Sequence, residues 1–200
     1  MNTVPLIIAT RNRHKAEEIA AILPPCYSVH TLDEYPAAPA DVEETGRSFA
    51  ENARQKAEAV SRALPGLVLA DDSGLCVDAL CGAPGILSAR FAGEHGNDAA
   101  NNAKLLNELA ALPSCAPYTA RFACALSLAE GGHEVASFYG TAEGHITLHP
   151  RGLTGFGYDP LFVPLGHDVT FAEMKPEAKN AISHRAKALQ QLAAYLRERA

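Results

Sequence analysis

The chain has 200 residues, of which 48% are hydrophobic and 20% are charged, and its formal net charge is −6. This apolar content is enough for a buried core and excludes general disorder. The negative balance argues against a broad nucleic-acid-binding surface, which normally carries a basic excess. A small anionic substrate remains compatible with it, because a few local cations can outweigh a distant negative surface.

The chain shows no targeting or metal-finger signal. Its N-terminus lacks the basic start and long apolar run of a signal peptide, and no stretch approaches the roughly 20 apolar residues that span a bilayer. The cysteines are odd in number, irregularly spaced and without a Cys-x-x-Cys pair, which favours small buried residues in a reducing compartment over a zinc site. We therefore expect a soluble, cytoplasmic protein with no membrane or nucleic-acid partner. The five cysteines are Cys26, Cys76, Cys81, Cys115 and Cys124.

The first elements alternate between strand and helix. Residues 4–10 form a short run rich in Ile and Val that predicts a strand buried on both faces. Asn12 can cap the helix that follows, which should end before Pro24. The Pro- and Ala-rich residues 36–45 predict a loop.

The middle of the chain continues this alternation. Ser48 and Glu51 form a capping box that should start a helix ending near residue 64. Residues 67–70 predict a second buried strand, with Asp71 and Asp72 at its tip.

The second half adds a hairpin and two helices. A turn is expected at residues 82–85, and a helix should begin at Asn97 or Asp98. Strand-like segments at 119–129 and 134–142 are joined by two glycines, which indicates a hairpin. An amphipathic helix should begin at Ser183. The order predicts an α/β fold, a mixed central sheet flanked by helices, and no linker or composition break divides residues 1–200.

The turn between the first strand and helix is a candidate anion site, because N–H groups at a helix start and nearby cations attract phosphate. The alternative is an ordinary capped helix with a solvated basic turn, and the Gly-x-x-x-x-Gly-Lys pattern of a P-loop is absent. The candidate residues are Thr10, Arg11, Asn12, Arg13, His14 and Lys15.

Two acidic pairs are candidate metal and base groups. Glu43 and Glu44 precede the second helix, and carboxylates suit Mg²⁺, although for this pair taken alone two solvated acids near a helix start are the simpler explanation. Asp71 and Asp72 follow a buried strand, where sites gather in open α/β sheets; the alternative is a turn closed by Gly74. Neighbouring side chains point in different directions, so one acid can bind metal while the other orients the backbone or a water. The sequence leaves open which does which.

Two further motifs lie near the C-terminus. The loop Gly-Phe-Gly-Tyr-Asp-Pro at 155–160 offers aromatic rings that can stack on a purine, or that instead fill the core. Lys179, His184 and Arg185 gather around the start of the last helix. Cations there oppose the helix dipole unless an anion binds, which favours a ligand over a solvated face.

The ordered set of segments resembles the inosine triphosphate pyrophosphatase family, in particular its bacterial members that hydrolyse XTP and dITP. A single such string would be weak evidence, but together they span nearly the whole chain in the family's order. The matching segments are 9–15, 44–53, 70–75, 82–90, 101–106, 120–122, 155–160 and 182–185.

The resemblance implies Mg²⁺-dependent hydrolysis of non-standard purine nucleoside triphosphates (ITP, dITP and XTP) to the monophosphate and pyrophosphate. It also implies two lobes with an active-site cleft between them, and a homodimer. Asp72 would be the base or water-orienting group and a metal neighbour, Glu44 a metal ligand and Glu43 a second candidate. Residues 10–15 would hold phosphate. The other substrate-binding residues would be Ser73, Phe156, Gly157, Tyr158, Asp159, Lys179, His184 and Arg185.

Some departures from the family pattern and three rival functions remain. Arg13 and His14 stand where small or varied residues are common, away from the expected chemistry. Leu87 stands where an aromatic residue is usual, which puts that part of the pocket or dimer surface in doubt. The nearest rival is a pyrophosphatase for dTTP, UTP or modified pyrimidines. A nucleotide-sensing module would keep Lys15, Phe156 and Arg185 but would not need Glu44 with Asp72. A redox or zinc role for the cysteines is the most distant alternative.

Overall fold

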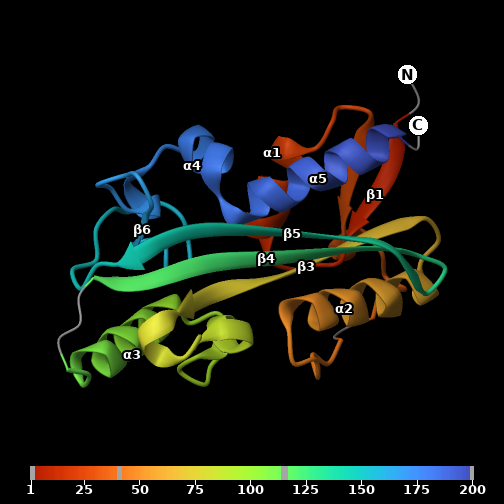
Figure 1. Ribbon diagram of the computed structural model, residues 1–200. Coiled ribbons are helices and arrows are strands. Elements are labelled where there is room, and N and C mark those ends of the chain that lie inside the picture. The colour runs from red at the N-terminus through yellow and green to blue at the C-terminus, as the bar shows by residue number, and fades with distance from the viewer. Residues whose placement is uncertain (1–2, 40–41, 114–116, 199–200) are drawn as a thin grey trace. The chain divides into compact units, whose positions relative to one another are not determined.

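Six strands form one mixed sheet in the order β2-β1-β3-β4-β5-β6 (Figure 1). In this computed structural model, which describes residues 3–39, 42–113 and 117–198, β1 pairs in parallel with β2 and β3, whereas β5 and β6 are antiparallel. The predicted α/β class, a mixed sheet flanked by helices, is confirmed. The strands are β1 (Val4–Ile8), β2 (Tyr27–Thr31), β3 (Leu67–Val77), β4 (Tyr118–Glu130), β5 (His133–Ile146) and β6 (Phe162–Pro164).

The chain divides into two compact units, and β3, β4 and β5 each contribute residues to both. Unit 1 comprises Met1–Asp72, Cys124–Gly140 and Arg185–Ala200. Unit 2 comprises Ser73–Ala123 and Thr141–His184.

In unit 1, helices cover both faces of the strands. Helices α1 (Arg13–Ile22) and α5 (His184–Glu198) lie on one face, and α2 (Phe49–Ala63) lies on the other (Figure 1). The residues of β1 alternate between two apolar clusters: Leu6 and Ile8 pack with α1 and α5, whereas Ile7 packs with α2. This confirms the prediction that the first strand is buried on both faces. Each such side chain, once fully buried, contributes roughly 1.5–3 kcal/mol.

Three predicted helix starts are confirmed by their caps. The Asn12 side chain accepts from Lys15 N–H, Ser48 accepts from Glu51 N–H, and Asn97 accepts from Ala100 N–H. The capping box of α2 is only half formed, because the Glu51 carboxylate accepts from the Arg47 N–H rather than from that of Ser48.

Unit 2 contains α3 (Asp98–Ala110) and α4 (Pro176–Ile182) around a core rich in aromatic rings. The ring of Phe122 stands edge-on to Phe162 at 4.8 Å between centroids and stacks on Phe171 at 5.9 Å. Short 3-10 helices complete the chain at Leu32–Glu34, Asp78–Leu80, Gly85–Arg90 and Phe171–Glu173.

The structure corrects two predictions about this framework. Strand β3 does not end at residue 70 but continues to Val77, so Asp71 and Asp72 lie inside the strand and not in a turn at its tip. The cysteines are not uniformly buried: Cys124 is buried, Cys76 is half-buried, and Cys26 and Cys81 are exposed. Cys115 lies outside the described residues. The strands β2 and β6 and the helix α4 were not predicted.

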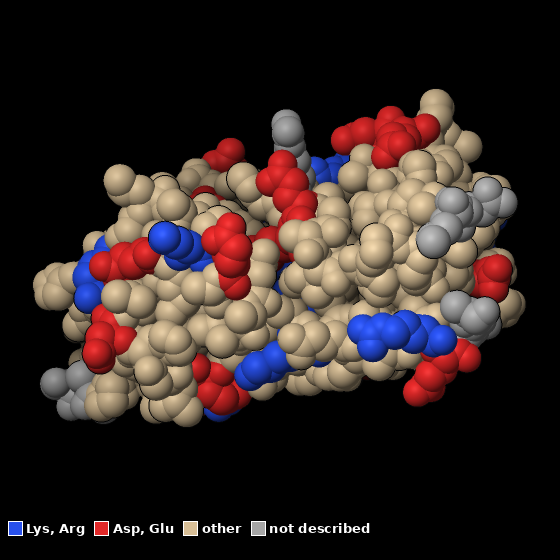
Figure 2. All heavy atoms as spheres, turned by 90° about the horizontal axis from the view of Figure 1, so that it is seen from above, with Lys and Arg blue, Asp and Glu red and all other residues tan. Residues whose placement is uncertain are grey.

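The distribution of charged side chains on the surface is consistent with the negative net charge. On the face drawn in Figure 2, acidic and basic side chains are interspersed and form no extended basic area. Among the described residues, no helix is long and apolar enough to cross a membrane.

Candidate functional site

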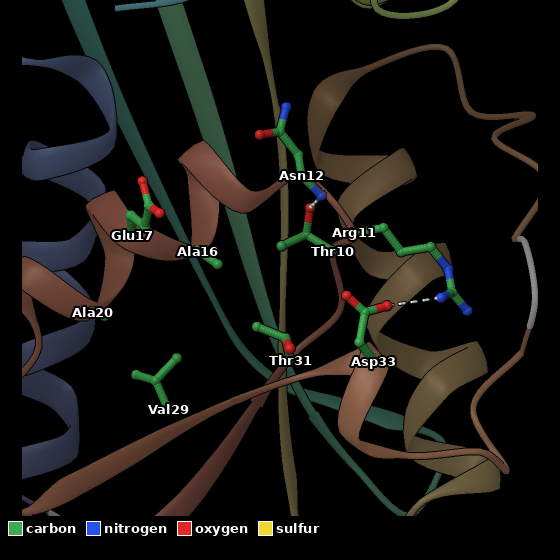
Figure 3. A pocket seen from close by; sticks show the side chains of 9 residues that line it. All are labelled: Thr10, Arg11, Asn12, Ala16, Glu17, Ala20, Val29, Thr31 and Asp33. Atoms are coloured by element: carbon green, nitrogen blue, oxygen red, sulfur yellow. Dashed lines mark hydrogen bonds and ion pairs between the residues drawn. The ribbon is translucent and has the colours of Figure 1, made fainter.

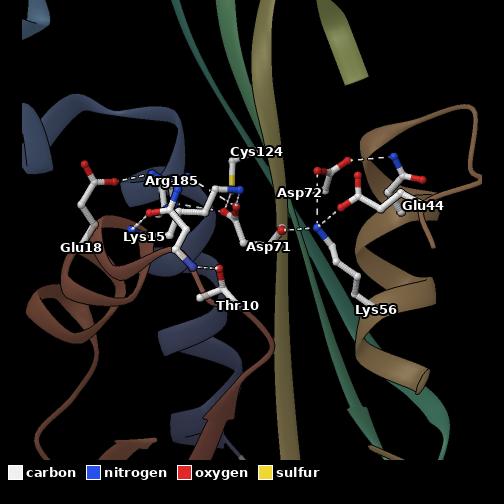
Figure 4. Close-up of polar contacts among 11 residues, drawn as sticks. Thr10, Lys15, Glu18, Glu44, Lys56, Asp71, Asp72, Cys124 and Arg185 are labelled. Atoms are coloured by element: carbon white, nitrogen blue, oxygen red, sulfur yellow. Dashed lines mark hydrogen bonds and ion pairs between the residues drawn. The ribbon is translucent and has the colours of Figure 1, made fainter. Parts of the chain in front are cut away.

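The pleat of β3 sends two adjacent carboxylates to opposite faces of the sheet. Successive side chains of a strand alternate between its faces, so Asp71 points towards α1 and α5, and Asp72 points towards α2 (Figure 4). Both are almost completely buried, with 2% and 7% of their surfaces exposed. Each acid therefore needs its own partners, and the two sets of partners decide their chemistry.

Asp71 is held by two cations and a thiol. The Lys15 ammonium lies 2.6 Å from Oδ1, and Arg185 Nε and Cys124 Sγ each donate to Oδ2 at 3.0 Å. Arg185 also pairs with Glu18. Burial alone would raise the pKa of Asp71, but Arg185 and Lys15 outweigh it and hold that pKa well below its ordinary value. Asp71 is thus a permanently ionised counterion, poorly suited to accept a proton.

Asp72 has a different environment. The Asn52 side-chain N–H donates to its Oδ2 at 3.1 Å, and the Lys56 ammonium lies 3.5 Å from its Oδ1. Burial raises the pKa of Asp72, and the negative charge of Glu44 adds to the rise, against the opposing effect of Lys56. The raised pKa makes Asp72 the better proton acceptor of the two acids.

Lys56 joins Asp72 to a third carboxylate. Its ammonium lies 2.9 Å from Glu44 Oε1 and also donates to the backbone carbonyl of Asp71 at 2.8 Å. Burial would lower the pKa of Lys56, but Asp72 and Glu44 outweigh it and raise that pKa above its ordinary value. Lys56 is therefore a fixed positive charge between two acids (Figure 4).

The donor set around Lys56 fits Mg²⁺. This ion is typically bound by one or two carboxylates together with waters and substrate phosphates. Glu44 and Asp72 supply two carboxylates within 3.5 Å of one ammonium nitrogen. Within the described part of the chain, no group of three or more His, Cys, Asp or Glu side chains is placed to hold a metal ion, so Mg²⁺ bound by Glu44 and Asp72 would take its other ligands from water and phosphate. Glu43 is exposed beside this pair.

The turn before α1 is shaped by its own hydrogen bonds. Thr10 Oγ1 accepts from the Asn12 N–H at 3.0 Å, and the Asn12 side chain caps the helix. Arg11 pairs with Asp33 at 3.1 Å. His14 is exposed, and the Arg13 side chain lies outside what the structure describes. This turn borders a pocket of about 500 Å³ (Figure 3), lined by Thr10, Arg11, Asn12, Ala16, Glu17, Ala20, Val29, Thr31 and Asp33.

In unit 2, the two aromatic rings of the Gly-rich loop lie in different environments. Tyr158 is 3% exposed, and its hydroxyl donates to the Ser88 carbonyl at 2.9 Å, so its ring belongs to the core. Phe156 is only half-buried, and the Lys179 ammonium lies 4.9 Å from its ring centroid. Asp159 is buried and accepts from Lys179 at 2.7 Å. Of the two rings, Phe156 is the one left to meet a ligand.

The three predicted C-terminal cations have different partners. Lys179 pairs with Asp159, and His184 stacks on Phe122 with 4.8 Å between ring centroids, both within unit 2. Arg185 is 1% exposed and belongs to the Asp71 network of unit 1. Carboxylates of the protein itself offset its opposition to the helix dipole, so the dipole argument no longer favours a ligand at Arg185, and substrate binding by this residue stays a prediction.

Four residues of these networks were missed by the sequence argument. Asn52 and Lys56 stand four apart on α2, which places them on one face of the helix and could have linked them to the preceding acids. Glu18 and Cys124 carry no such signal, because they reach the site only through the tertiary fold. Ser73 follows Asp72 in the strand and is half-buried.

The chain matches the model of the Ham1 family over residues 6–195. It is 51% identical to the dITP/XTP pyrophosphatase of Halalkalibacterium halodurans over 95% of this chain and 97% of that protein. It is 53% identical to the dITP/XTP pyrophosphatase of Geobacillus kaustophilus over 94% of this chain and 91% of that one. The solved structure of the Staphylococcus aureus Ham1 protein superposes with a TM-score of 0.86 at 42% identity, over 98% of this chain and 100% of that one.

Proposed function

This chain belongs to the Ham1 family, and we propose that it hydrolyses non-standard purine nucleoside triphosphates such as dITP, ITP and XTP to the monophosphate and pyrophosphate. The observation that carries the proposal is the division of labour on β3. Asp72 shares Lys56 with Glu44, while its neighbour Asp71 is engaged by Lys15 and Arg185. A protein that only bound nucleotides would need neither a proton-accepting carboxylate nor a pair of carboxylates that fits a metal ion.

The reaction requires one proton acceptor and strong charge stabilisation. A water oxygen forms a bond to the α-phosphorus while the bond to the β-phosphate oxygen breaks, and the water's proton passes to Asp72. Asn52 orients that carboxylate by donating to its Oδ2. Mg²⁺, held by Glu44 and Asp72, would neutralise phosphoryl charge when bound. Lys56 keeps a further positive charge beside both acids.

The phosphate end of the substrate is assigned to the turn before α1. Thr10, Asn12 and the first N–H groups of the helix supply donors, and Lys15 supplies a cation whose position is set by Asp71. Arg11, Arg13 and His14 belong to the same segment and remain proposed phosphate contacts. The half-buried Lys15 ammonium is the cation that this network holds in place.

The purine end is assigned to the loop residues Phe156, Gly157, Tyr158 and Asp159, with Lys179 and His184. Phe156 offers the ring face, and Lys179 a buried donor beside it. A site that donates to a 6-keto oxygen rejects a 6-amino purine, because its donors are then left without partners. GTP also has a 6-keto group, so its exclusion needs a second discrimination at the 2-position. Ser73 and Arg185 remain substrate-binding proposals, with Arg185 acting through Asp71.

A substrate panel tests the proposal. Pyrophosphate release should be fastest with dITP, ITP and XTP and slow with GTP, ATP and UTP. Equal turnover of ATP and ITP would refute the purine specificity, and preference for UTP or dTTP would favour the pyrimidine pyrophosphatase. Nucleotide binding by calorimetry without any product would favour the sensing module.

Three further properties belong to the same proposal. We expect turnover to depend on Mg²⁺, the protein to be a homodimer, and its place of action to be the cytoplasm. Sedimentation of the purified protein measures directly whether it is a monomer or a dimer. A protein that is monomeric at the concentrations that support full activity would contradict the expected homodimer.

A further inference from the structure

We propose that Asp98 and Asn102 of α3 are positioning residues, which hold the backbone around Gly157 and thereby set purine selectivity. The inference rests on the proposed function, and it concerns two residues to which neither the sequence analysis nor the site described above assigns a role toward the substrate. They touch the loop, not the substrate.

The clamp consists of two hydrogen bonds from one helix face. The Gly157 N–H donates to Asp98 Oδ2 at 2.6 Å, and the Asn102 side-chain N–H donates to the Gly157 carbonyl at 2.9 Å. Asp98 and Asn102 are four apart, so they project from the same face of α3. The two bonds fix the peptide planes on both sides of the Gly157 α-carbon.

Gly157 is the residue at which this control is most useful. Its φ is +61°, a left-handed conformation that glycine adopts without the steric cost of a side chain. Glycine is also the residue with the greatest backbone freedom, so this conformation needs external partners to persist. Asp98 and Asn102 supply them, one for each polar group of the residue.

The clamp acts directly on the ring of Phe156. The peptide that ends at the Gly157 N–H begins at Phe156, and the Phe156 N–H itself donates to Asp159 Oδ2 at 3.0 Å. The ring is therefore carried by a residue whose peptide groups on both sides are anchored to carboxylates. Its distance from the Lys179 ammonium, 4.9 Å, depends on both anchors. Small misplacements of binding groups cost substantial rate and selectivity, so loosening the clamp should weaken the purine contacts.

The hydrogen bonds of the clamp lie within unit 2, whereas the residues assigned to phosphate belong to unit 1, which gives the proposal a sharp test. Asp98→Ala should raise the KM for ITP about tenfold, because a hydrogen bond to a charged group is lost. It should also reduce the ratio of kcat/KM for ITP over ATP. Inhibition by inorganic tripolyphosphate, which presents phosphates and no base, should be unchanged.

The conservative variant separates the hydrogen bond from the charge. Asp98→Asn keeps an oxygen that can accept from the Gly157 N–H but removes the acid from the first turn of α3, so it should restore the KM and selectivity of the wild type. Asn102→Asp, which places an acceptor against the Gly157 carbonyl, should resemble Asp98→Ala. The matched control is Glu94→Ala, which removes an exposed acid that accepts from the helix-capping Asn97 and leaves the loop untouched.

Each result decides the matter. Equal loss of ITP turnover and tripolyphosphate binding, or an Asp98→Asn variant as impaired as Asp98→Ala, would reduce Asp98 to a structural acid and overturn the proposal. Wild-type kinetics in both Asp98→Ala and Asn102→Asp would also overturn it. Should Asp98→Ala fail to fold, Asn102→Ala carries the same comparison. A wild-type enzyme that does not hydrolyse ITP refutes the proposed function instead, and this is measured first.

Discussion

Adjacent residues of identical chemistry acquire opposite roles in this protein through strand geometry alone. Asp71 and Asp72 differ by one position, and the period of two in a strand directs one to a pair of cations and the other to an amide and a shared lysine. The first pKa is lowered and the second is raised. Substituting each acid by its amide should therefore produce opposite phenotypes.

Asp71→Asn should destabilise the fold. Removing one partner of a buried ion pair takes the Asp71 charge away from Lys15 and from Arg185, which keeps only Glu18, and this costs about 3–5 kcal/mol. Because the folded pKa of Asp71 is below its unfolded value, the contribution is complete above about pH 4 and is lost as the pH falls through the folded pKa. Urea unfolding should show a large difference between wild type and variant at pH 7 that shrinks in acid.

The control for that measurement is Asp33→Asn. Asp33 pairs with Arg11, but the side chains are 71% and 49% exposed, so the loss should lie within about 1 kcal/mol. Equal stability of Asp71→Asn and Asp33→Asn would show that the buried Asp71 network contributes no more to the free energy of unfolding than the exposed Asp33 pair does.

Asp72→Asn should abolish catalysis without loss of stability. The amide oxygen can still accept from Asn52, but it cannot take a proton from water, and a general base is worth about 10²–10⁴-fold in rate. Burial already disfavours the ionised form of Asp72, so the neutral side chain should unfold at the same urea concentration or a higher one. Single-turnover kinetics with ITP and calorimetry of ITP binding measure the two parts; a fully active variant would exclude Asp72 as the base.

At the scale of secondary-structure elements, local signals located the helices better than the ends of the strands. The caps at Asn12, Ser48 and Asn97 could be read because a cap is a local hydrogen bond. Asp71-Asp72-Ser73-Gly74 has turn-forming composition, yet it continues β3, because partners from other elements satisfy the acids. One of them, Arg185, is 114 residues from Asp71. No window of sequence contains that information.

The elements missed by the sequence argument share a physical cause. Tyr27–Thr31 is a half-buried strand at one end of the sheet order, and Phe162–Pro164 is only three residues long at the other. Neither is long enough to show a periodic pattern, and α4 has a single buried residue of its own, Lys179. The networks around β3 show a related limit: the sequence argument named Asp72 and Glu44, but their partner Lys56 and the Asp72 donor Asn52 were found only in the folded structure.

The packing of β3 against residues 85–88 can be tested at Gly74. A Cβ at this position would lie 2.3 Å from Ser88 Oγ and 2.6 Å from the Gly85 carbonyl oxygen. Gly74→Ala should therefore destabilise the protein by about 1–3 kcal/mol through overpacking. Adding Ser88→Ala removes one of three close contacts, because the Cβ of residue 88 at 2.8 Å and the Gly85 carbonyl oxygen remain, so the double variant should recover only part of the loss, as measured by thermal unfolding. An unchanged melting temperature in Gly74→Ala would mean that β3 does not pass this close to residues 85–88.

On the scale of the whole molecule, the positive groups that meet the substrate must be placed locally, because the net charge is negative. The protein carries a net charge of −6, and its proposed substrate is a polyanion. Favourable encounter then depends on local groups and not on the mean surface. Lys15, Lys56 and Lys179 are ion-paired lysines whose side chains are less than 20% exposed. Lys15 and Lys56 lie in the β3 networks of unit 1, and Lys179 lies in unit 2. These cations are already paired with carboxylates, so a divalent cation is the natural source of the remaining positive charge.

Magnesium dependence is accordingly the last prediction. Chelation by EDTA should abolish ITP hydrolysis, and added Mg²⁺ should restore it. Glu44→Gln should raise the Mg²⁺ concentration needed for half-maximal rate by about tenfold or more, since one of the two carboxylates that fit the ion is lost. Glu43→Gln should have a much smaller effect, because Glu43 is exposed and Glu44 shares Lys56 with Asp72. A greater effect of Glu43→Gln would assign the metal to Glu43 and make the pairing of Glu44 with Lys56 purely structural, and equal effects would contradict the preference for Glu44.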